Sequence, residues 1–349
     1  MSRVPVAIIG ASGYTGAELL RLLIGHPHVD VIAIYANRAA GSSLADVYPQ
    51  FAGRFDSTIE TFDADAVAAR AKVAFAALPH GASATAVAEL RERGVAVIDL
   101  SADFRLDDAK VYGAWYGEHP APALLADAVY GLPEFHRDEI RAASLVAAPG
   151  CYPTSAILAI GPLLAAGMVD SAGLIVDAKS GASGAGRSPG QSTHLPEAGE
   201  GIRAYKVAGT HRHTPEIEQE LGKLARRDIA LTFTPHLAPM SRGIFTCVYA
   251  TPVDPARDAA AYRAALVDGY AGEPFVTVLG EGRVPDTAHV RGSNRAHVAV
   301  AYDRRAGRVI AMSAIDNLVK GAAGQAVQCL NLMRGWPETT ALDAVALFP

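Results

Sequence analysis

Strand-like apolar runs alternate with helical patterns over the first 150 residues. The runs cover residues 4–9, 29–36, 73–78, 95–100 and 145–148, and alanine and leucine recur at helical spacing in 64–71 and 84–93. Strands that alternate with helices form a parallel sheet that helices cover on both faces. The pattern therefore predicts an N-terminal α/β domain with a Rossmann-type parallel sheet, whose ligands bind beyond the carboxyl ends of the strands.

A different order of elements begins at residue 151. Helical patterns cover 154–166, 214–227 and 256–270. Strands are expected in succession at 174–178, 230–235, 243–252, 275–279, 296–302 and 308–315. Successive strands with a helix on one side predict an α+β second domain with a mixed or antiparallel sheet. The broad face of that sheet could mediate dimerisation.

Two further segments complete the expected domain division. Residues 316–331 are typical of a small-residue helix, whose glycines favour close packing back on the first domain, and residues 111–141 are typical of a long irregular connection rich in proline, glycine and aromatic residues. We expect residues 1–150 together with 316–349 to form a dinucleotide-binding domain. Residues 151–315 are expected to form a catalytic and dimerisation domain.

Composition excludes several classes of protein. The chain has 349 residues, which favours two domains, and a net charge of −5 without a run of lysine or arginine. Nucleic acid and membrane are therefore not expected as partners. Three cysteines without a Cys-x-x-Cys pair argue against a disulfide framework and a zinc site. The most apolar window, 156–169, is broken by Gly161 and Pro162 and is too short to span a bilayer. We expect a cytoplasmic protein.

The first strand leads into a glycine-rich loop that precedes a helix. Strand, glycine loop and helix in this order are what a dinucleotide-binding turn requires, because the backbone N–H groups at the helix start bind a pyrophosphate. Glycines that only close a tight turn are the alternative. The expected cofactor contacts are Gly10, Ser12, Gly13, Tyr14, Thr15 and Gly16.

The residues after the second strand bear on the choice between NAD and NADP. An NAD-binding turn usually carries Asp or Glu at this place for the ribose 2′-hydroxyl. This chain has Arg38 there, with Ser42 close by in sequence. An arginine and hydroxyls suit a 2′-phosphate, so the sequence predicts NADPH/NADP as the cofactor. A solvated loop arginine is the alternative for Arg38.

Cys151 lies between the strand-like run 145–148 and the helical run 154–166. Gly150 permits a sharp reversal, and Pro153 is suited to a first helical turn. A thiol at or just before a helix N-terminus has a lowered pKa, and the helix amides there can hold an oxyanion. This context favours a nucleophile over the alternative, a small buried apolar residue. Cys247 and Cys329 fit that alternative.

Other polar residues follow the ends of strands, where ligands are expected. Pro79 follows the third strand, and Arg105 follows the fourth, where its guanidinium could clamp a phosphate or carboxylate. A surface ion pair is the alternative for Arg105. Ser180 and Gly181 lie in a Gly/Ser-rich loop, 179–187, that permits close backbone approach to a ligand.

Two histidines precede the helix expected at 214–227. His211 and His213 flank Arg212, a spacing that is not a strong metal-binding pattern, so no metal is expected. One of them is expected to be a catalytic acid/base, and we favour His211 because it lies further from the helix start. Structural histidines are the alternative. Thr214 can cap this helix and Pro215 can take its first position.

Four separated motifs carry a family resemblance over nearly the whole chain. They are Gly10-Ala-Ser-Gly-Tyr-Thr-Gly-Ala-Glu-Leu, Ala148-Pro-Gly-Cys-Tyr-Pro-Thr, Gly209-Thr-His-Arg-His-Thr-Pro-Glu-Ile and Asp316-Asn-Leu-Val-Lys-Gly-Ala-Ala-Gly-Gln-Ala. In this order they resemble the N-acetyl-gamma-glutamyl-phosphate reductases of arginine biosynthesis. Aspartate-semialdehyde and glyceraldehyde-3-phosphate dehydrogenases are wider relatives. The catalytic histidine of the aspartate-semialdehyde enzymes lies late in the chain, nearer His297 here, so His211 and His213 match the closer family only.

The resemblance implies NADPH-dependent reduction of N-acetyl-L-glutamyl 5-phosphate to the 5-semialdehyde, with release of inorganic phosphate. It implies a thioester on Cys151, Asn317 near the nicotinamide, and substrate contacts from Arg105 and Arg212. It also implies a Rossmann domain completed by the C-terminal helix, in a homo-dimer or homo-tetramer. The rival interpretations are the same chemistry on aspartyl phosphate or a carrier-bound aminoadipyl phosphate, and a non-catalytic NADP-sensing module.

Overall fold

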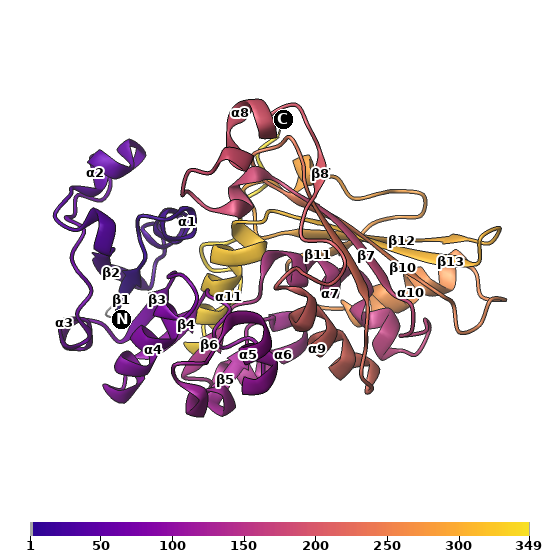
Figure 1. Cartoon of the computed structure of the whole chain (residues 1–349), viewed down its shortest axis with the longest axis horizontal. Helices are drawn as coiled ribbons and strands as arrows, with labels where there is room; N and C mark the ends of the chain where they lie inside the picture. Colours follow the sequence, from indigo (N-terminus) through magenta and orange to yellow (C-terminus); the bar gives the residue numbers. More distant parts are fainter. Residues whose placement is uncertain (1–2, 349) are drawn as a thin grey trace. The chain divides into compact units, whose positions relative to one another are not determined.

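A computed structural model describes residues 3–348, apart from the side chain of Ser192. The described chain forms two compact units. The first holds the residues up to Gly150 together with Ala322–Asp343, and the second holds Cys151–Gly321 together with the residues that follow Asp343. Each unit has its own sheet (Figure 1). No helix among the described residues is long and apolar enough to cross a membrane.

The first unit is built on a six-stranded parallel sheet in the order β2-β1-β3-β4-β6-β5. Its strands are β1 (Val4–Ile9), β2 (Val29–Tyr35), β3 (Val73–Ala76), β4 (Ala96–Asp99), β5 (Ala128–Tyr130) and β6 (Leu145–Ala147). Its helices are α1 (Tyr14–Leu23), α2 (Leu44–Val47), α3 (Ala64–Arg70), α4 (Ala82–Glu92), α5 (Ala109–Tyr116), α6 (Pro133–Ala142) and α11 (Gly324–Met333). The Rossmann-type parallel sheet predicted from the alternating pattern is confirmed.

The segment expected to be a long irregular connection is largely regular. Residues 111–141 fall mostly in α5, a 3₁₀ helix at Pro122–Asp127, strand β5 and α6. Asp108 caps α5 through the amide of Lys110, Gly117 ends it at φ +94°, and Pro133 starts α6. The prolines and glycines here mark the ends of short elements, which is why their density suggested a loop.

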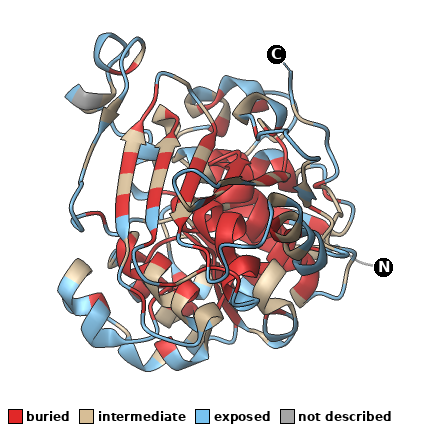
Figure 2. Cartoon of the chain, turned by 90° about the vertical axis from the view of Figure 1, so that its right-hand side faces the viewer, coloured by how far each residue is buried: buried red, intermediate tan, exposed pale blue. Residues whose placement is uncertain are grey.

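The second unit carries a seven-stranded mixed sheet in the order β11-β12-β13-β10-β7-β9-β8. Its strands are β7 (Ile175–Ser180), β8 (Arg203–Ala204), β9 (Thr232–Leu237), β10 (Ile244–Ala250), β11 (Val276–Val278), β12 (Ala296–Asp303) and β13 (Arg308–Ile315). Its helices are α7 (Cys151–Ala165), α8 (Leu195–Ala198), α9 (Thr214–Ala225) and α10 (Ala259–Gly269). The predicted mixed sheet is confirmed, and α7 and α10 pack against it (Figure 1). Strands with alternating buried and less buried bands are visible in Figure 2.

Helix α7 runs through Pro162, as the helix predicted over 154–166 requires. Proline has no N–H for the carbonyl four residues earlier, which here belongs to Leu158. The hydroxyl of Tyr270, just beyond α10, donates to that carbonyl oxygen at 2.6 Å. A side chain from a distant part of the sequence therefore replaces the missing helical hydrogen bond.

The last helical segment differs from the single helix expected at 316–331. A five-residue π-helix at Val319–Ala323 precedes α11, and residues 316–321 pack within the second unit. Asp316 is buried and accepts hydrogen bonds from the amides of Leu318, Val319 and Gly292. Helix α11 itself packs with α1 and α6 in the first unit. The chain thus leaves the second unit at Gly321, later than the boundary expected at 316.

Candidate functional site

The glycine loop after β1 lies in the first unit, and two of its glycines are required by the fold. Gly10 has φ +89°, and a Cβ there would lie 2.2 Å from the carbonyl oxygen of Ala77. A Cβ at Gly16 would lie 2.5 Å from the carbonyl oxygen of Gly10. At Gly13, the N-cap of α1, a Cβ would meet only that same oxygen at 3.6 Å. The fold thus leaves room at Gly13, beside first-turn amides that have no acceptor within the helix.

The remaining candidates of the first unit lie in loops that follow strands. Arg38 is exposed in a short 3₁₀ helix after β2, and Ser42 is half-buried nearby. Pro79 is exposed between β3 and α4. The buried carboxylate of Asp103 accepts from the amides of Gly81 and Ala84 at the start of α4, so a protein carboxylate already satisfies this helix N-terminus.

Arg105 makes contacts that neither sequence interpretation anticipated. Its side chain is 7 % exposed, and its Nε and Nη2 groups each donate at 2.8 Å to a backbone carbonyl, those of Ala148 and Leu100. A buried guanidinium holding two carbonyls ties the loop after β4 to the loop after β6. Arg105 is therefore in the first place a structural link between the two strand ends.

Cys151 is the first residue of α7, which agrees with the expected place at or just before a helix N-terminus. Its side chain is half-buried, whereas Cys247 and Cys329 are buried, as expected. Gly321 packs directly on it, because a Cβ at Gly321 would lie 2.8 Å from the Cβ of Cys151. Among the described residues no group of His, Cys, Asp and Glu is arranged to hold a metal ion.

A buried cluster of three hydroxyls fixes the start of α7 to the sheet. The Oγ of Ser155 lies 2.8 Å from Oγ1 of Thr246 on β10 and 2.6 Å from Oγ of Ser313 on β13. The Ser313 hydroxyl donates to the carbonyl oxygen of Ser155 at 2.7 Å. All three residues are fully buried, and Ser155 lies one turn after Cys151. The turn that begins with the cysteine is therefore held to two central strands.

Aromatic rings and histidines lie beside Cys151 in the second unit. With it they form the Cys151 cluster, which consists of Cys151, Tyr152, Tyr205, His211 and His213. The ring centroid of His211 lies 5.6 Å from that of Tyr152 and 5.5 Å from that of Tyr205. The Tyr205 hydroxyl donates to the Tyr152 hydroxyl at 3.2 Å, and the latter donates to the carbonyl oxygen of His236 at 2.9 Å. Burial, opposed by the Tyr152 hydrogen bond and aided by the Cys151 charge, raises the pKa of Tyr205 to about 12, so this phenol is protonated near neutral pH. Sequence reasoning overlooked both tyrosines, although they flank Cys151 and the histidine motif.

The two histidines have different surroundings. His211 is 8 % exposed, and burial, together with the charge of Lys206, lowers its pKa to about 4. The backbone N–H of His213 donates to Nδ1 of His211 at 3.1 Å, so the neutral His211 ring carries its proton on Nε2. His213 is half-buried, and its ring lies 4.9 Å from that of His211. Arg212 between them is exposed.

The start of α9 differs from the prediction. The N-cap is His213, Thr214 is the first helical residue, and the Thr214 hydroxyl has no hydrogen-bond partner among the described residues. Pro215 consequently takes the second helical position and not the first. The hydrogen bond from the His213 amide to His211 makes the chain enter the helix one residue earlier than a threonine cap would.

Ser180, Gly181 and Asn317 lie together in the second unit. A Cβ at Gly181 would lie 2.8 Å from backbone atoms of Ser241 and Arg242, so this glycine permits a close approach within the protein. The buried side chain of Asn317 accepts from the Gly243 amide at 2.8 Å and donates to the Ser183 hydroxyl at 2.9 Å. Asn317 therefore orders the loop that follows β7.

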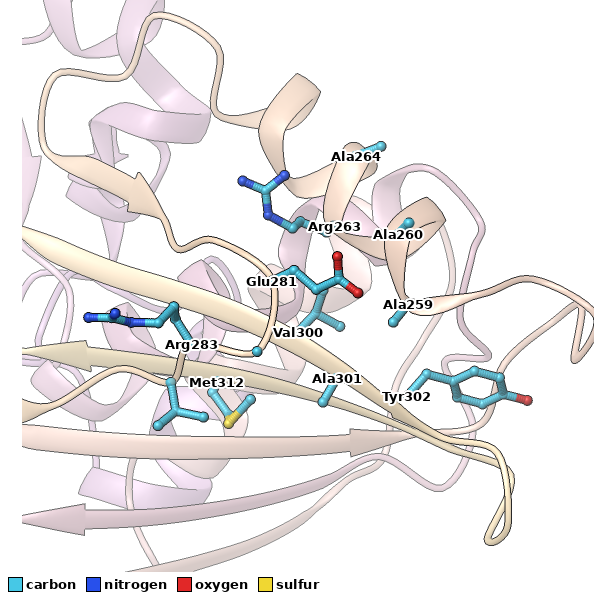
Figure 3. Close-up of a pocket in the computed structure, with 12 residues that line it drawn as sticks. Ala259, Ala260, Arg263, Ala264, Glu281, Arg283, Val300, Ala301, Tyr302 and Met312 are labelled. Carbon is cyan, nitrogen blue, oxygen red and sulfur yellow. The ribbon is translucent and has the colours of Figure 1, made fainter.

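A pocket of about 440 Å³ also lies in the second unit, between α10 and β12 (Figure 3). Arg263, Glu281, Arg283, Tyr302 and Met312 are among its lining residues. The Nε of Arg263 donates to the carbonyl oxygen of Leu279, and the pocket carries charges of both signs. It shares no residue with the Cys151 cluster, and we assign it no part in the chemistry.

Comparison with known proteins defines the class to which this fold and site belong. The family described as "Semialdehyde dehydrogenase, NAD binding domain" matches residues 5–143, and "Semialdehyde dehydrogenase, dimerisation domain" matches residues 151–317. The structure of aspartate semialdehyde dehydrogenase II complexed with ASA from Vibrio cholerae shares the fold, with a TM-score of 0.73, 20 % identity, and coverage of 96 % of this chain and 99 % of that one.

Curated relatives then give the particular family. N-acetyl-gamma-glutamyl-phosphate reductase of Citrifermentans bemidjiense is 51 % identical over 349 residues, covering 99 % of this chain and all of the relative. The protein of the same name from Moorella thermoacetica is 52 % identical over 347 residues, covering 99 % of this chain and all of the relative. The chain belongs to the N-acetyl-gamma-glutamyl-phosphate reductase family.

Proposed function

We propose that this protein catalyses the NADPH-dependent reduction of N-acetyl-L-glutamyl 5-phosphate to N-acetyl-L-glutamate 5-semialdehyde, with release of phosphate. The observation that carries the proposal is Cys151 as the first residue of a fifteen-residue helix, with Tyr205 and His211 packed on the adjacent Tyr152. A helix N-terminus favours the thiolate, which is the nucleophile that acyl transfer needs. The family in which the relatives lie supplies the substrate and places the reaction in arginine biosynthesis.

The first chemical step is acyl transfer to sulfur. The Cys151 thiolate forms a bond to the acyl-phosphate carbon, the C–O bond to phosphorus breaks, and phosphate leaves with the electron pair. The Tyr152 amide lies in the first turn of α7, has no acceptor within the helix and can donate to the oxyanion. The product is a thioester on Cys151, which accepts hydride more readily than a carboxylate does.

The cofactor loop of the first unit suits NADPH. Gly13 leaves the first-turn amides of α1 open to a pyrophosphate, and Arg38 is exposed where a 2′-phosphate would need a cation. We assign cofactor contacts to Gly10–Gly16 and Arg38, with Ser42 and Pro79 beside them. NADPH, when bound, supplies the hydride that reduces the thioester carbon. We also assign cofactor contacts to Ser180, Gly181 and Asn317, because the Asn317 side chain orders the loop that contains Ser180 and Gly181.

The histidines then act on the reduced adduct. Because its pKa is about 4, His211 is neutral at pH 7 and donates a hydrogen bond from Nε2 to the oxygen of the adduct. We assign the acid/base step to His213, in place of the His211 favoured from the sequence, because the buried His211 ring is neutral. His213 protonates the adduct oxygen as hydride arrives and takes the same proton back as the C–S bond breaks. The electron pair of that bond goes to sulfur, so the aldehyde leaves and sulfur returns as the thiolate.

Trapping the acyl-enzyme tests this proposal. The protein is mixed with N-acetylglutamyl phosphate without NADPH and quenched in acid, and the peptide that gains an N-acetylglutamyl mass is identified. We expect the label on Cys151. The Cys151→Ser variant should lose at least about a thousandfold in turnover, the scale seen when a nucleophile is removed, and should bind NADPH within about twofold of the unaltered protein.

The matched control is Cys329→Ala, a buried thiol of the first unit that should retain its turnover. A serine variant that kept most of its turnover would exclude the covalent route. Activity with aspartate semialdehyde and phosphate, and none with the N-acetylglutamate semialdehyde, would assign another acyl phosphate. Binding of NADPH without any turnover would favour a non-catalytic module.

The open face of the second sheet supports a homodimer. Ser155 of α7 bonds Thr246 and Ser313, so α7 covers one face. The alternate residues of β10, β12 and β13 point the other way and form an apolar cluster with Leu279, which follows β11. We call it the open-face cluster, and it consists of Phe245, Cys247, Tyr249, Leu279, Ala299, Ile310 and Met312. A second copy that covers this cluster would remove it from water.

A reducing compartment suits the proposed chemistry. Cys151, Cys247 and Cys329 form no disulfide in the part of the chain that the structure describes. A nucleophilic thiol requires that state, and disulfides are rare in the cytoplasm. We therefore place the enzyme there.

A further inference from the structure

A tight turn with a strained backbone joins Tyr205 to His211. Lys206 has φ +46° and Ala208 has φ +56°, in the left-handed region that residues with a Cβ rarely adopt. Such conformations persist where the surrounding contacts determine them, and they gather at functional sites. The hydrogen bonds within this loop do not explain why its backbone is held in the left-handed region.

Both ends of this turn are anchored in the Cys151 cluster. The Tyr205 amide donates to the carbonyl oxygen of Pro235 at 3.1 Å, and its hydroxyl bonds Tyr152. At the other end the His211 ring packs edge-on against Tyr152, and the carbonyl oxygen of His211 accepts from the Thr214 amide at 2.9 Å. Lys206 follows the first anchor directly, so the strained turn sets its position relative to the cluster.

The charge of Lys206 is uncompensated and reaches the cluster. Its side chain is exposed and forms no ion pair or hydrogen bond with any residue that the structure describes. It is nevertheless close enough to His211 to contribute to lowering the pKa of that imidazole. The Lys206 charge disfavours protonation of the His211 ring, and an anion bound to Lys206 would offset that effect.

From this geometry we infer that Lys206 binds the phosphate group of the acyl phosphate and of the inorganic phosphate that leaves it. The inference rests on the proposed function, because that reaction supplies a phosphate dianion next to the acyl carbon on Cys151. A lysine ammonium is a strong point charge that suits a phosphate. Arg105, which is expected from the sequence to clamp a phosphate or carboxylate, donates through Nε and Nη2 to the carbonyl oxygens of Ala148 and Leu100, and Lys206 would add a second cation for the phosphate.

Kinetics in the oxidative direction test the inference. NADP is reduced with the N-acetylglutamate semialdehyde while inorganic phosphate is varied. In Lys206→Met we expect the KM for phosphate to rise about tenfold to a hundredfold, the range for a lost charged hydrogen bond, with an unchanged KM for NADP. Lys206→Arg should recover part of the loss because it keeps the charge. The control Lys110→Met removes an exposed lysine of α5 and should leave both constants unchanged.

A second measurement needs no turnover. Iodoacetate, an anion, and iodoacetamide, a neutral reagent of similar shape, alkylate the Cys151 thiol, and phosphate is added as a protectant. Lys206→Met should lower the rate ratio of iodoacetate to iodoacetamide several-fold and weaken protection by phosphate. A KM for phosphate within twofold of the unaltered protein, or an unchanged rate ratio, would overturn the inference. Absence of turnover in the unaltered protein would instead contradict the proposed function, and the alkylation rates would still report on Lys206.

Discussion

At the scale of single residues, neighbouring atoms decide which residue type a position accepts and which charge state a side chain has. Gly10 must be glycine because of its φ and the carbonyl of Ala77, whereas Gly13 has room for a side chain in the protein alone. The requirement for glycine at position 13 would then come from the bound cofactor. His211 is a second case, because its burial keeps the ring neutral at pH 7.

The two glycines give a matched pair of variants. Gly10→Ala should lower the free energy of unfolding by about 2–4 kcal/mol, because a left-handed backbone and a steric clash add. Gly13→Ala should cost less than about 1 kcal/mol, the scale of a changed N-cap, and should weaken NADPH binding at least about tenfold. Urea unfolding and a fluorescence titration with NADPH measure the two effects. Equal stability losses, or unchanged NADPH affinity in Gly13→Ala, would contradict this account.

The low pKa of His211 makes stability depend on pH. Its folded pKa of about 4 lies below the ordinary value of 6.5, so between these values the unfolded chain binds more protons. Stability present at pH 7 is therefore lost as the pH falls below 6.5. The loss attributable to this group should be about 2 kcal/mol at pH 5. Urea unfolding of the unaltered protein and of His211→Asn should show that the variant loses about that much less between pH 7 and pH 5. Parallel losses would mean that His211 titrates normally.

At the scale of elements, α7 is the part on which the site depends. Its first residue is Cys151, its next turn is held by the Ser155, Thr246 and Ser313 hydroxyls, and its later half is continued through Pro162. Polar residues from outside the helix satisfy the last two of these places, Thr246 and Ser313 at the second turn and Tyr270 at Pro162. The helix is therefore fixed along its length by groups that lie far away in the sequence.

Removing one of these groups should be costly. Tyr270→Phe leaves the buried carbonyl of Leu158 without the donor that replaces Pro162, so we expect a loss of about 1–3 kcal/mol in the free energy of unfolding. The control Tyr302→Phe removes a hydroxyl that bonds the carbonyl oxygen of Pro255 at an exposed position, and should cost under about 1 kcal/mol. Thermal and urea unfolding compare the two variants, and a similar small loss in both would argue that water satisfies Leu158.

For the whole molecule, the open-face cluster is the feature that a single chain does not explain. One face of the second sheet is covered by α7, while Phe245, Ile310 and their apolar neighbours form a cluster on the other. Phe245, Tyr249, Leu279 and Ile310 are only half-buried, and a partly exposed apolar group of this kind suits an interaction site. The matching family is described as a dimerisation domain over residues 151–317, which agrees with this placement.

Phe245→Glu should weaken the association of chains because it puts a charge into the open-face cluster. Sedimentation velocity over a range of protein concentrations should show a mass shift toward the single chain. The control Val253→Glu alters an exposed valine outside the cluster and should keep the mass of the unaltered protein. If the unaltered protein sediments as four chains and Phe245→Glu as two, the protein has two kinds of interface and the open-face cluster forms one of them. An unchanged mass would place the interface elsewhere.

The sequence by itself determined the two sheets, the glycine loop and the place of Cys151, because each depends on local signals: strand and helix periodicity, turn glycines, and a proline suited to a first helical turn. The short helices and strand between residues 111 and 141 were not predicted, because the prolines and glycines at their ends are also typical of a loop. Only the tertiary structure decided the environment of each polar group. Arg105 donates to backbone carbonyls, and Tyr270 donates to the carbonyl that Pro162 leaves without a helical partner. Tyr152 and Tyr205 pack beside His211. Burial and hydrogen-bond partners come from residues far apart in the chain, and no local pattern encodes them.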